Sequence, residues 1–95
     1  AGELPDASEI EGPDVVEEQG GFLVSGALNL TRVRQRTGFV AEPTEDYQTL
    51  AGLVVSLLDR LPVIGDSLEW QGWRMTVVAV EERRVTRVLL VRVDR

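Results

Sequence analysis

The stretch from Thr49 to Asp66, TLAGLVVSLLDRLPVIGD, constrains the fold of this chain more than any other part of the sequence. Its apolar residues recur at the spacing of one helical face. They are Leu50, Leu53, Val54, Leu57 and Leu61. Thr49 can cap this helix, and Leu61-Pro62 can end it, because the residue before a proline is pushed out of the α region. The sequence therefore predicts a helix from about Thr49 to Arg60, followed by a turn at Gly65-Asp66.

Two residues of this stretch need a separate explanation. Gly52 lies in the first turn of the predicted helix, where glycine costs about 1 kcal/mol relative to alanine. We therefore expect another backbone to approach it closely. Asp66 is the polar residue with most scope for a further role, but beside Gly65 we interpret it as a turn residue.

From Ser67 onward the apolar period changes to two, which is typical of strands with one buried face. Three strands are predicted, at Ser67–Trp70, Trp73–Val80 and Val85–Val93. Gln71-Gly72 and the residues near 81–84 supply the turns of an antiparallel meander.

The two longer strands differ in their patterns. In the first of them one face is expected to hold Trp73, Met75, Val77 and Ala79, with Arg74 and Thr76 on the other. The last strand carries VLLV at residues 88–91, which is apolar on both sides. This predicts either a bulge or a second face that a partner buries.

The N-terminal half predicts a β-hairpin and a short helix. Val15-Val16 and Phe22–Val24 flank the glycine turn at residues 19–21, and Gly26 ends the second strand. Asn29 can cap a helix from Leu30 to Thr37, which Gly38 ends. Its arginines at positions 32, 34 and 36 are interpreted as a solvated face, because residues two apart point to different sides of a helix. The fold class is α+β, with both helices packed on the sheet.

Residues 1–13, AGELPDASEIEGP, are acidic, show no periodicity and are interpreted as a linker before a domain at 14–95. The alternative, a cation-binding loop, requires carboxylates at fixed offsets, and that pattern is absent from these residues. At 95 residues the chain has room for one core.

Composition excludes several function classes. The absence of cysteine excludes disulfides and thiolate metal sites, and the absence of histidine removes the usual general base. A net charge of −6 argues against nucleic-acid binding. All ten basic residues are arginines and lie after Leu30. No apolar run approaches the roughly 20 residues of a membrane span, and no secretory signal is present, so we expect a soluble, intracellular fragment.

No catalytic constellation is predicted, and no cofactor-binding residue is assigned. The serines at positions 8, 25, 56 and 67 have no histidine or lysine to activate them, and no phosphate-binding motif occurs. Trp70 and Trp73 are interpreted as core or interface residues, the alternative being a stack on a flat ligand. The carboxylates at Glu42, Glu45 and Asp46 either precede a helix N-terminus or hold Mg²⁺ or Ca²⁺. We assign no metal site to them.

Several motifs together resemble the transporter-associated domain of CorC/HlyC proteins. They are TLAGLV at residues 49–54, LPxxGD at 61–66, GGFLVSG at 20–26, the short helix within 29–38, and RRVxxV at 83–88. GEL at residues 2–4 looks like the exit of a CBS domain pair. The resemblance covers residues 14 to 93. Gln19 departs from it where an acidic residue is common, and Glu81-Glu82 lacks the usual glycine.

The resemblance implies a context for the chain. Such domains follow a transmembrane domain and a CBS pair on the cytosolic side, in proteins linked to magnesium and cobalt efflux or named haemolysins. Their fold is similar to part of an FAD-binding domain. We therefore expect a non-catalytic regulatory or assembly module, whose partners are the CBS pair and membrane domain of its own parent chain. A homodimer is a further expectation, and direct membrane insertion of this fragment is not expected. The alternative is a module that binds FAD or an adenine nucleotide.

Overall fold

The computed structural model describes residues 14–18 and 20–93. These residues contain five strands and two helices, joined by loops. They are β1 (Val15–Glu18), β2 (Gly21–Ser25), α2 (Leu30–Thr37), α3 (Leu50–Leu58), β3 (Ser67–Trp70), β4 (Trp73–Glu81) and β5 (Arg84–Arg92). The predicted α+β class, hairpin, two helices and terminal meander are confirmed. The predicted linker at 1–13 and Gln19 lie outside the described residues.

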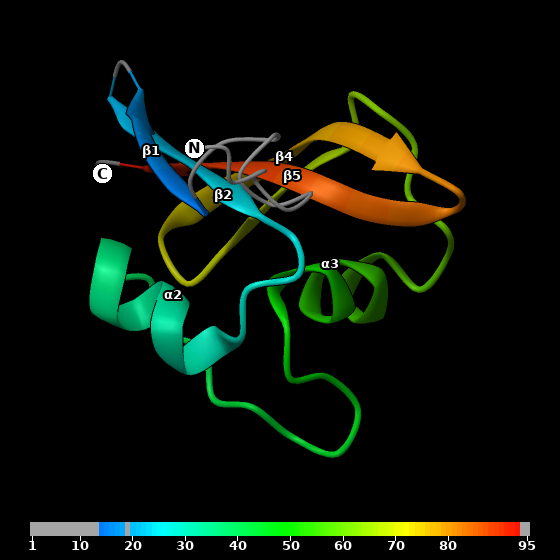
Figure 1. Cartoon of the computed structure of the whole chain (residues 1–95), viewed down its shortest axis with the longest axis horizontal. Helices are drawn as coiled ribbons and strands as arrows, with labels where there is room; N and C mark the ends of the chain where they lie inside the picture. Colours follow the sequence, from blue (N-terminus) through cyan, green and yellow to red (C-terminus); the bar gives the residue numbers. More distant parts are fainter. Residues whose placement is uncertain (1–13, 19, 94–95) are drawn as a thin grey trace, which may run out of the picture.

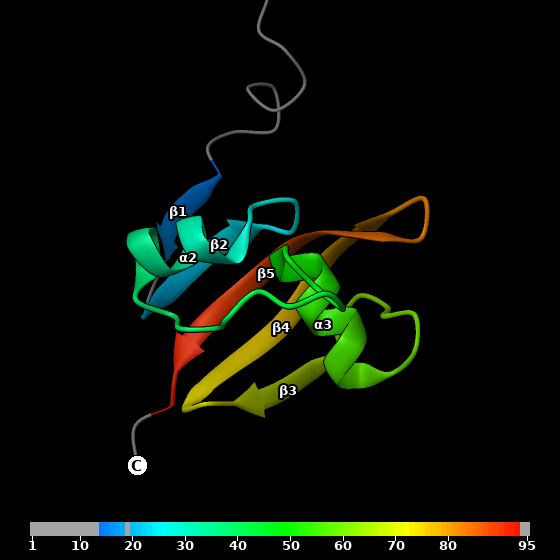
Figure 2. The same cartoon turned by 90° about the horizontal axis from the view of Figure 1, so that it is seen from below.

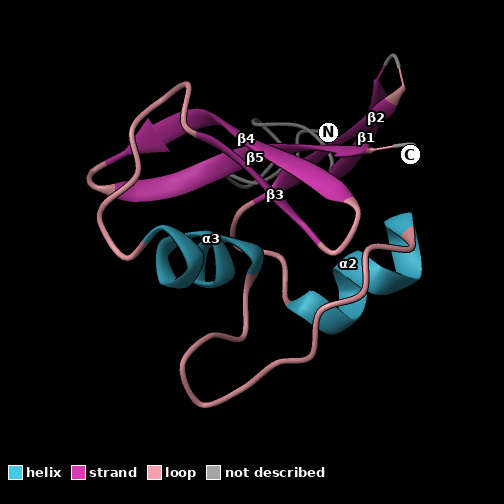
Figure 3. Ribbon diagram, turned by 180° about the vertical axis from the view of Figure 1, so that it is seen from behind, coloured by secondary structure: helices cyan, strands magenta, loops and turns pink. Residues whose placement is uncertain are grey.

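The strands form one antiparallel sheet in the order β1-β2-β5-β4-β3. Both helices lie on the same side of it (Figure 1), and seen from below they cover one face (Figure 2). Figure 3 shows the same two layers from behind. The opposite face, here called the outer face, has no described helix over it.

The pairing of β2 with β5 unites the hairpin and the meander into this single sheet. In that pair Phe22 lies opposite Leu90, and Val24 lies opposite Val88. Val24, Val88 and Leu90 are fully buried beneath the helices. The sequence predicts the hairpin and the meander but not the pairing of β2 with β5 that joins them. This pairing buries the apolar face that the two groups of strands share.

Both ends of α2 agree with the prediction. The Asn29 side chain accepts a hydrogen bond from the backbone N–H of Arg32 at 2.8 Å. Gly38 adopts a left-handed conformation with φ of 87°, and its N–H donates to the carbonyl of Arg34. Leu30 and Val33 are buried, while the three arginines of the helix are exposed, as predicted.

The helix α3 begins as predicted but ends early. The Thr49 hydroxyl caps it by accepting from the N–H of Gly52 at 3.1 Å. The helix stops at Leu58, because Asp59 turns left-handed (φ 59°) before the proline is reached. The prediction that Leu61 extends the buried stripe is therefore wrong, and its side chain is 55% exposed.

The first turn of α3 is tied to the segment that follows β2. The N–H groups of Leu50 and Ala51 donate to the carbonyls of Leu28 and Gly26, at 3.0 and 2.9 Å. These bonds satisfy donors that the start of a helix leaves without partners. Gly52 is approached by Tyr47, whose Cα would lie 3.6 Å from an added Cβ. That is an ordinary van der Waals contact, and the nearer atoms, at 3.3 Å, belong to the side chains of Thr49 and Tyr47, so the structure does not show the expected close approach by another backbone.

Residues 88–91 pair regularly with β4, so the bulge predicted there is absent, and the register between β4 and β5 shifts instead at Val77–Val80. Trp73, Met75 and Val77 are buried on the helix side, as predicted. The register then shifts, so that Ala79 lies opposite Arg87. The prediction that Ala79 shares the buried face is wrong, because the extra residue reverses the alternation.

Candidate functional site

The loop between α3 and β3 presents three apolar side chains to solvent. Leu61, Val63 and Ile64 are 55%, 59% and 63% exposed, whereas Pro62 is buried. These three are the most exposed large apolar side chains of the described residues, and they lie within four positions. We call residues 61–64 the apolar loop. Such a concentration indicates a contact surface, since single exposed apolar residues are ordinary but clusters are not.

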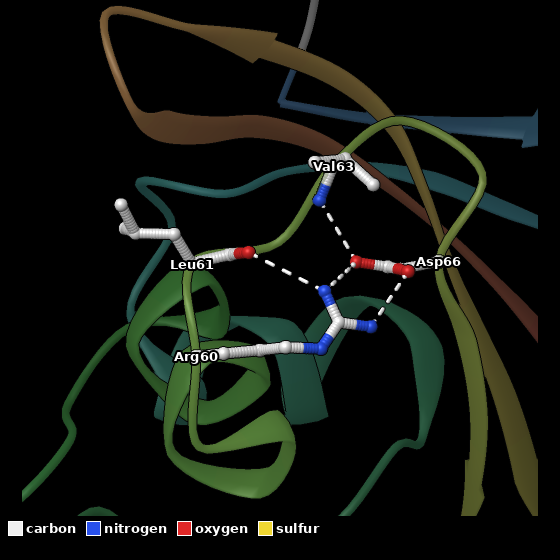
Figure 4. A network of polar contacts seen from close by, with 4 residues as sticks. All are labelled: Arg60, Leu61, Val63 and Asp66. Carbon is white, nitrogen blue, oxygen red and sulfur yellow. Dashed lines mark hydrogen bonds and ion pairs between the residues drawn. The ribbon is translucent and has the colours of Figure 1, made fainter.

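An ion pair closes the base of the apolar loop (Figure 4). The guanidinium of Arg60 makes two hydrogen bonds of 2.9 Å to the two carboxylate oxygens of Asp66. Oδ2 of Asp66 also accepts from the backbone N–H of Val63 at 2.8 Å. We call this arrangement the Arg60–Asp66 clamp. Because two nitrogens of the guanidinium bond to the two oxygens of the carboxylate, the geometry fixes the relative orientation of the two side chains as well as their distance.

The clamp keeps both of its charges at neutral pH. The hydrogen bond from Arg60, followed by that from the Val63 N–H, holds the pKa of Asp66 below its ordinary value. The same hydrogen bond raises the pKa of Arg60 above its ordinary range. Asp66 is the more enclosed partner, with its side chain 14% exposed against 54% for Arg60.

Backbone hydrogen bonds also attach the end of the loop to β4. The N–H of Gly65 donates to the carbonyl of Val77, and the N–H of Val77 donates to the carbonyl of Asp66, both at 2.8 Å. The apolar loop is therefore held at its start by Arg60 and at its end by the sheet. A surface held in this way loses little conformational freedom when it binds a partner.

A second feature is a hollow of about 500 Å³ between α3 and the turn that joins β4 to β5. Its α3 wall includes the small residues Ala51, Gly52 and Ser56. Arg83 and Arg84 line it together with Asp46 and Asp59, so positive and negative charges face the same space. Arg60 also lines it, so three arginines face two aspartates there, and the hollow offers hydrogen-bond donors to a polar or anionic ligand.

The carboxylates that were considered as metal ligands do not converge. Glu42, Glu45 and Asp46 are all exposed. Among the described residues no group of three or more acidic side chains is placed to hold a metal ion. The alternative cation loop within residues 1–13 lies outside the described residues.

The two tryptophans belong to an aromatic cluster. The ring of Phe39 packs 5.8 Å from Trp70 and edge-on, 5.6 Å, from Trp73, measured between centroids. Trp73 is only 6% exposed, and the guanidinium of Arg92 lies 5.6 Å from its ring centre. Trp73 is thus a core residue, as predicted, while Trp70 is half-buried at the edge of the cluster.

The serines of the described residues have structural partners or face solvent. The Ser25 hydroxyl accepts from the N–H of Ala27 at 3.2 Å, and that of Ser67 accepts from Thr76 at 3.3 Å. Ser56 is exposed on α3. Ser8 lies outside the described residues.

Sequence reasoning missed the apolar loop and its clamp. The sequence indicates a turn at Asp66 and no role for Arg60. The signal present in the sequence is an arginine six positions before an aspartate, on either side of a Pro-x-x-Gly turn. Neither helix in the described part of the chain is long and apolar enough to cross a membrane.

The family model for the transporter associated domain, CorC_HlyC, matches residues 15–94. The chain is similar to the UPF0053 protein MT1890 of Mycobacterium tuberculosis, with 31% identity over 96% of this chain and 22% of that protein. It is also similar to the UPF0053 inner membrane protein YoaE of Escherichia coli, with 31% identity over 97% of this chain and 18% of that protein. The chain therefore spans about a fifth of the length of these relatives.

Solved structures have the same fold. The transporter associated domain of a Xylella fastidiosa hemolysin, in complex with Mg²⁺ and Mn²⁺, superposes with a TM-score of 0.74 at 31% identity, over 86% of this chain and 100% of that chain. The region associated with a putative Mg²⁺ and Co²⁺ transporter (CorC) from Neisseria meningitidis gives a TM-score of 0.75 at 23% identity, over 85% of this chain and 100% of that chain. The second likeness shows the fold alone.

Proposed function

We propose that this chain, which belongs to the CorC/HlyC transporter associated domain family, is a non-catalytic regulatory and assembly module of a larger membrane protein involved in divalent-cation efflux. Two comparisons support this context. A relative that is 31% identical is an inner membrane protein of which the chain spans 18%. A solved transporter associated domain with the same fold and 31% identity comes from a Xylella fastidiosa hemolysin, in complex with Mg²⁺ and Mn²⁺.

The observation that carries the proposal is the clamped apolar loop. Catalysis requires groups that converge on a reacting atom, whereas this loop offers a preorganised apolar contact and no reactive group. We place its partner in the remainder of the same polypeptide, in the CBS pair or the membrane domain on the cytoplasmic side. Such a contact would transmit the position of this domain to the transport unit.

The test is made in the full-length protein, in cells that depend on it for resistance to Mg²⁺ or Co²⁺. The triple substitution Leu61→Ser, Val63→Ser and Ile64→Ser removes the apolar contacts but leaves the clamp in place. We expect resistance to fall to the level given by deletion of residues 14–95. The matched control is Val40→Ser, which changes another exposed apolar residue, 49% exposed, outside the loop.

Two outcomes would contradict the proposal. Unchanged efflux and assembly after deletion of residues 14–95 would show that the domain has no role in transport. An effect of Val40→Ser as large as that of the triple variant would show that the loop has no special part. The amount of each variant in membrane fractions is measured as well, so that a loss of expression is excluded as the cause of a loss of resistance.

The second candidate is a module that binds FAD or an adenine nucleotide, and the hollow beside α3 favours it. Arg83 and Arg84 could donate to phosphate oxygens there. Calorimetric titration of the domain with ATP and with FAD tests this function. Binding that is lost in the Arg83→Ala, Arg84→Ala variant would support it, and no heat up to millimolar ligand would contradict it.

A further inference from the structure

Arg60 belongs to two features of the surface at once. Its guanidinium holds Asp66 in the clamp through two hydrogen bonds of 2.9 Å (Figure 4). The same residue lines the hollow between α3 and the turn that joins β4 to β5. The Arg60 side chain is 54% exposed, so a solute in the hollow can reach it. The clamp and the hollow therefore share one cation.

The other charged residues of the hollow do not pair with one another. Arg83 and Arg84 line it, and in the part of the chain that the structure describes neither side chain makes an ion pair or a hydrogen bond. Asp46 and Asp59 line the same space, and no ion pair joins either of them to these arginines. While the clamp holds Arg60, the charges left to the hollow therefore balance, with two arginines against two aspartates.

We propose that the hollow binds a diphosphate group, and that this binding draws Arg60 away from Asp66 and so opens the clamp. Arg60 follows α3, whereas Arg83 and Arg84 lie where β4 turns into β5, so a ligand with two anionic groups can contact both segments. Guanidinium groups pair well with phosphate, because two parallel N–H donors match two oxygens. Since the other charges balance, an anion is attracted to the hollow only when Arg60 turns toward it. Binding and opening of the clamp are therefore coupled.

Asp66 can lose Arg60 without being left unpaired. Its Oδ2 also accepts from the N–H of Val63 at 2.8 Å, and that bond does not involve Arg60. An ion pair with an exposed partner adds little stability, so a doubly charged anion can compete for the cation. When Arg60 leaves, the apolar loop keeps its bonds to β4 but loses its hold at the other end. In the full-length protein the ligand thereby controls the contact that the loop makes, a step that rests on the proposed function.

A double-mutant cycle on the whole chain tests the coupling, with inorganic pyrophosphate as the probe and calorimetry as the measurement. Because coupling between two binding events is reciprocal, Asp66→Asn, which releases Arg60, should raise the affinity for pyrophosphate about fivefold or more. In the Arg60→Gln background the same substitution should change the affinity by less than about twofold, or binding should be undetectable with and without it. The cycle is repeated with ADP, and a gain that requires Arg60 with either ligand supports the proposal. The comparison shows whether free diphosphate suffices or a nucleotide must carry it.

The amide of Val63 provides a second readout, because Asp66 holds this amide and Arg60 holds Asp66. Saturating pyrophosphate should speed hydrogen exchange at this amide about twofold or more. Potassium chloride at the same ionic strength is the control for screening, and it should have a smaller effect.

Three results would overturn the proposal. The first is that neither ligand binds the parent chain or the Asp66→Asn chain at millimolar concentration. The second is an equal gain from Asp66→Asn in both backgrounds, which would assign the gain to the lost negative charge alone. The third is binding that leaves exchange at Val63 unchanged. None of these results depends on the efflux test of the apolar loop, which leaves Arg60 and Asp66 in place, so the two proposals can fail separately.

Discussion

At the scale of single residues, Asp66 determines the shape of the apolar loop. It accepts from Arg60 at one end of the loop and from the Val63 N–H within it. An exposed ion pair by itself adds little stability. This carboxylate matters because three donors converge on it and because its side chain is largely enclosed. Removal of its charge should therefore loosen the loop before it affects the core.

The substitution Asp66→Asn should lower the melting temperature at pH 7. The folded pKa of Asp66 lies below the ordinary value near 3.9, so its contribution is fully present above the unfolded pKa. It is lost as the pH falls through the lowered folded pKa. The difference between variant and parent should shrink over that acid range in thermal unfolding followed by circular dichroism. Asp59→Asn is the control, and a difference that does not vary with pH would refute the assignment.

Gly26 is another residue that cannot be exchanged freely. An added Cβ would overlap the carbonyl oxygen of Val85 and lie 3.2 Å from the Cβ of Ala51. Gly26→Ala should therefore cost about 1–3 kcal/mol of unfolding free energy, as overpacking does. Urea denaturation measures it. Gly52→Ala serves as the comparison, because there an added Cβ meets no atom closer than 3.3 Å. Equal losses in both variants would contradict this account.

At the scale of elements, the β4–β5 turn is locally unfavourable. Glu82 and Arg83 both have positive φ, 54° and 66°, without a glycine. A turn of this type matches the twist of the strands but prefers Asn-Gly. The sequence predicts a turn near residues 81–84, and it shows that the glycine common in the family is absent at Glu81-Glu82. The long pairing of β4 with β5 imposes the conformation.

The double substitution Glu82→Asn and Arg83→Gly should raise the unfolding free energy by about 1 kcal/mol, since non-glycine residues in this region are strained. In a domain of this size that corresponds to roughly 4–8 °C in melting temperature. Calorimetry measures both quantities. The substitution Gln71→Asn, in the β3–β4 turn that already has Gly72, should raise the unfolding free energy by less. A greater gain at Gln71 would contradict the argument.

At the scale of the whole molecule, Phe39 joins the helical layer to the sheet. It lies between α2 and α3, is fully buried, and packs on both tryptophans. Phe39→Ala should cost about 3–5 kcal/mol, a large share of the stability of a small domain. Urea unfolding followed by tryptophan fluorescence measures the loss. Val40→Ala, one position along and 49% exposed, should change stability by less than about 0.5 kcal/mol. Similar losses at both positions would refute this role of Phe39.

Much of the fold follows from short stretches of sequence. The caps Asn29, Gly38 and Thr49 were each predicted, because a cap depends on residues within one turn of it. The same holds for the period of two that placed Trp73 and Met75 on the buried face. The family resemblance rested on these same local motifs, and the family model confirmed it.

The candidate site was less predictable. The exposure of Leu61 reverses its predicted place in the helical stripe, because Asp59 ends α3 in a left-handed conformation. Periodicity alone does not record where a helix stops. Arg60 and Asp66 meet only because the loop between them folds back on itself. The spacing of two charges along a sequence does not predict the conformation of the loop between them.

The sequence by itself determined the elements, the caps Asn29, Gly38 and Thr49, the turns and the family, since each depends on neighbours within a few residues. The tertiary structure decided which strands meet. The pairing of Phe22 with Leu90 joins residues 68 positions apart, and it forms because one continuous apolar face can be buried only if the hairpin and the meander share a sheet. The apolar loop stays exposed at one end of α3, where the Arg60–Asp66 clamp fixes its conformation.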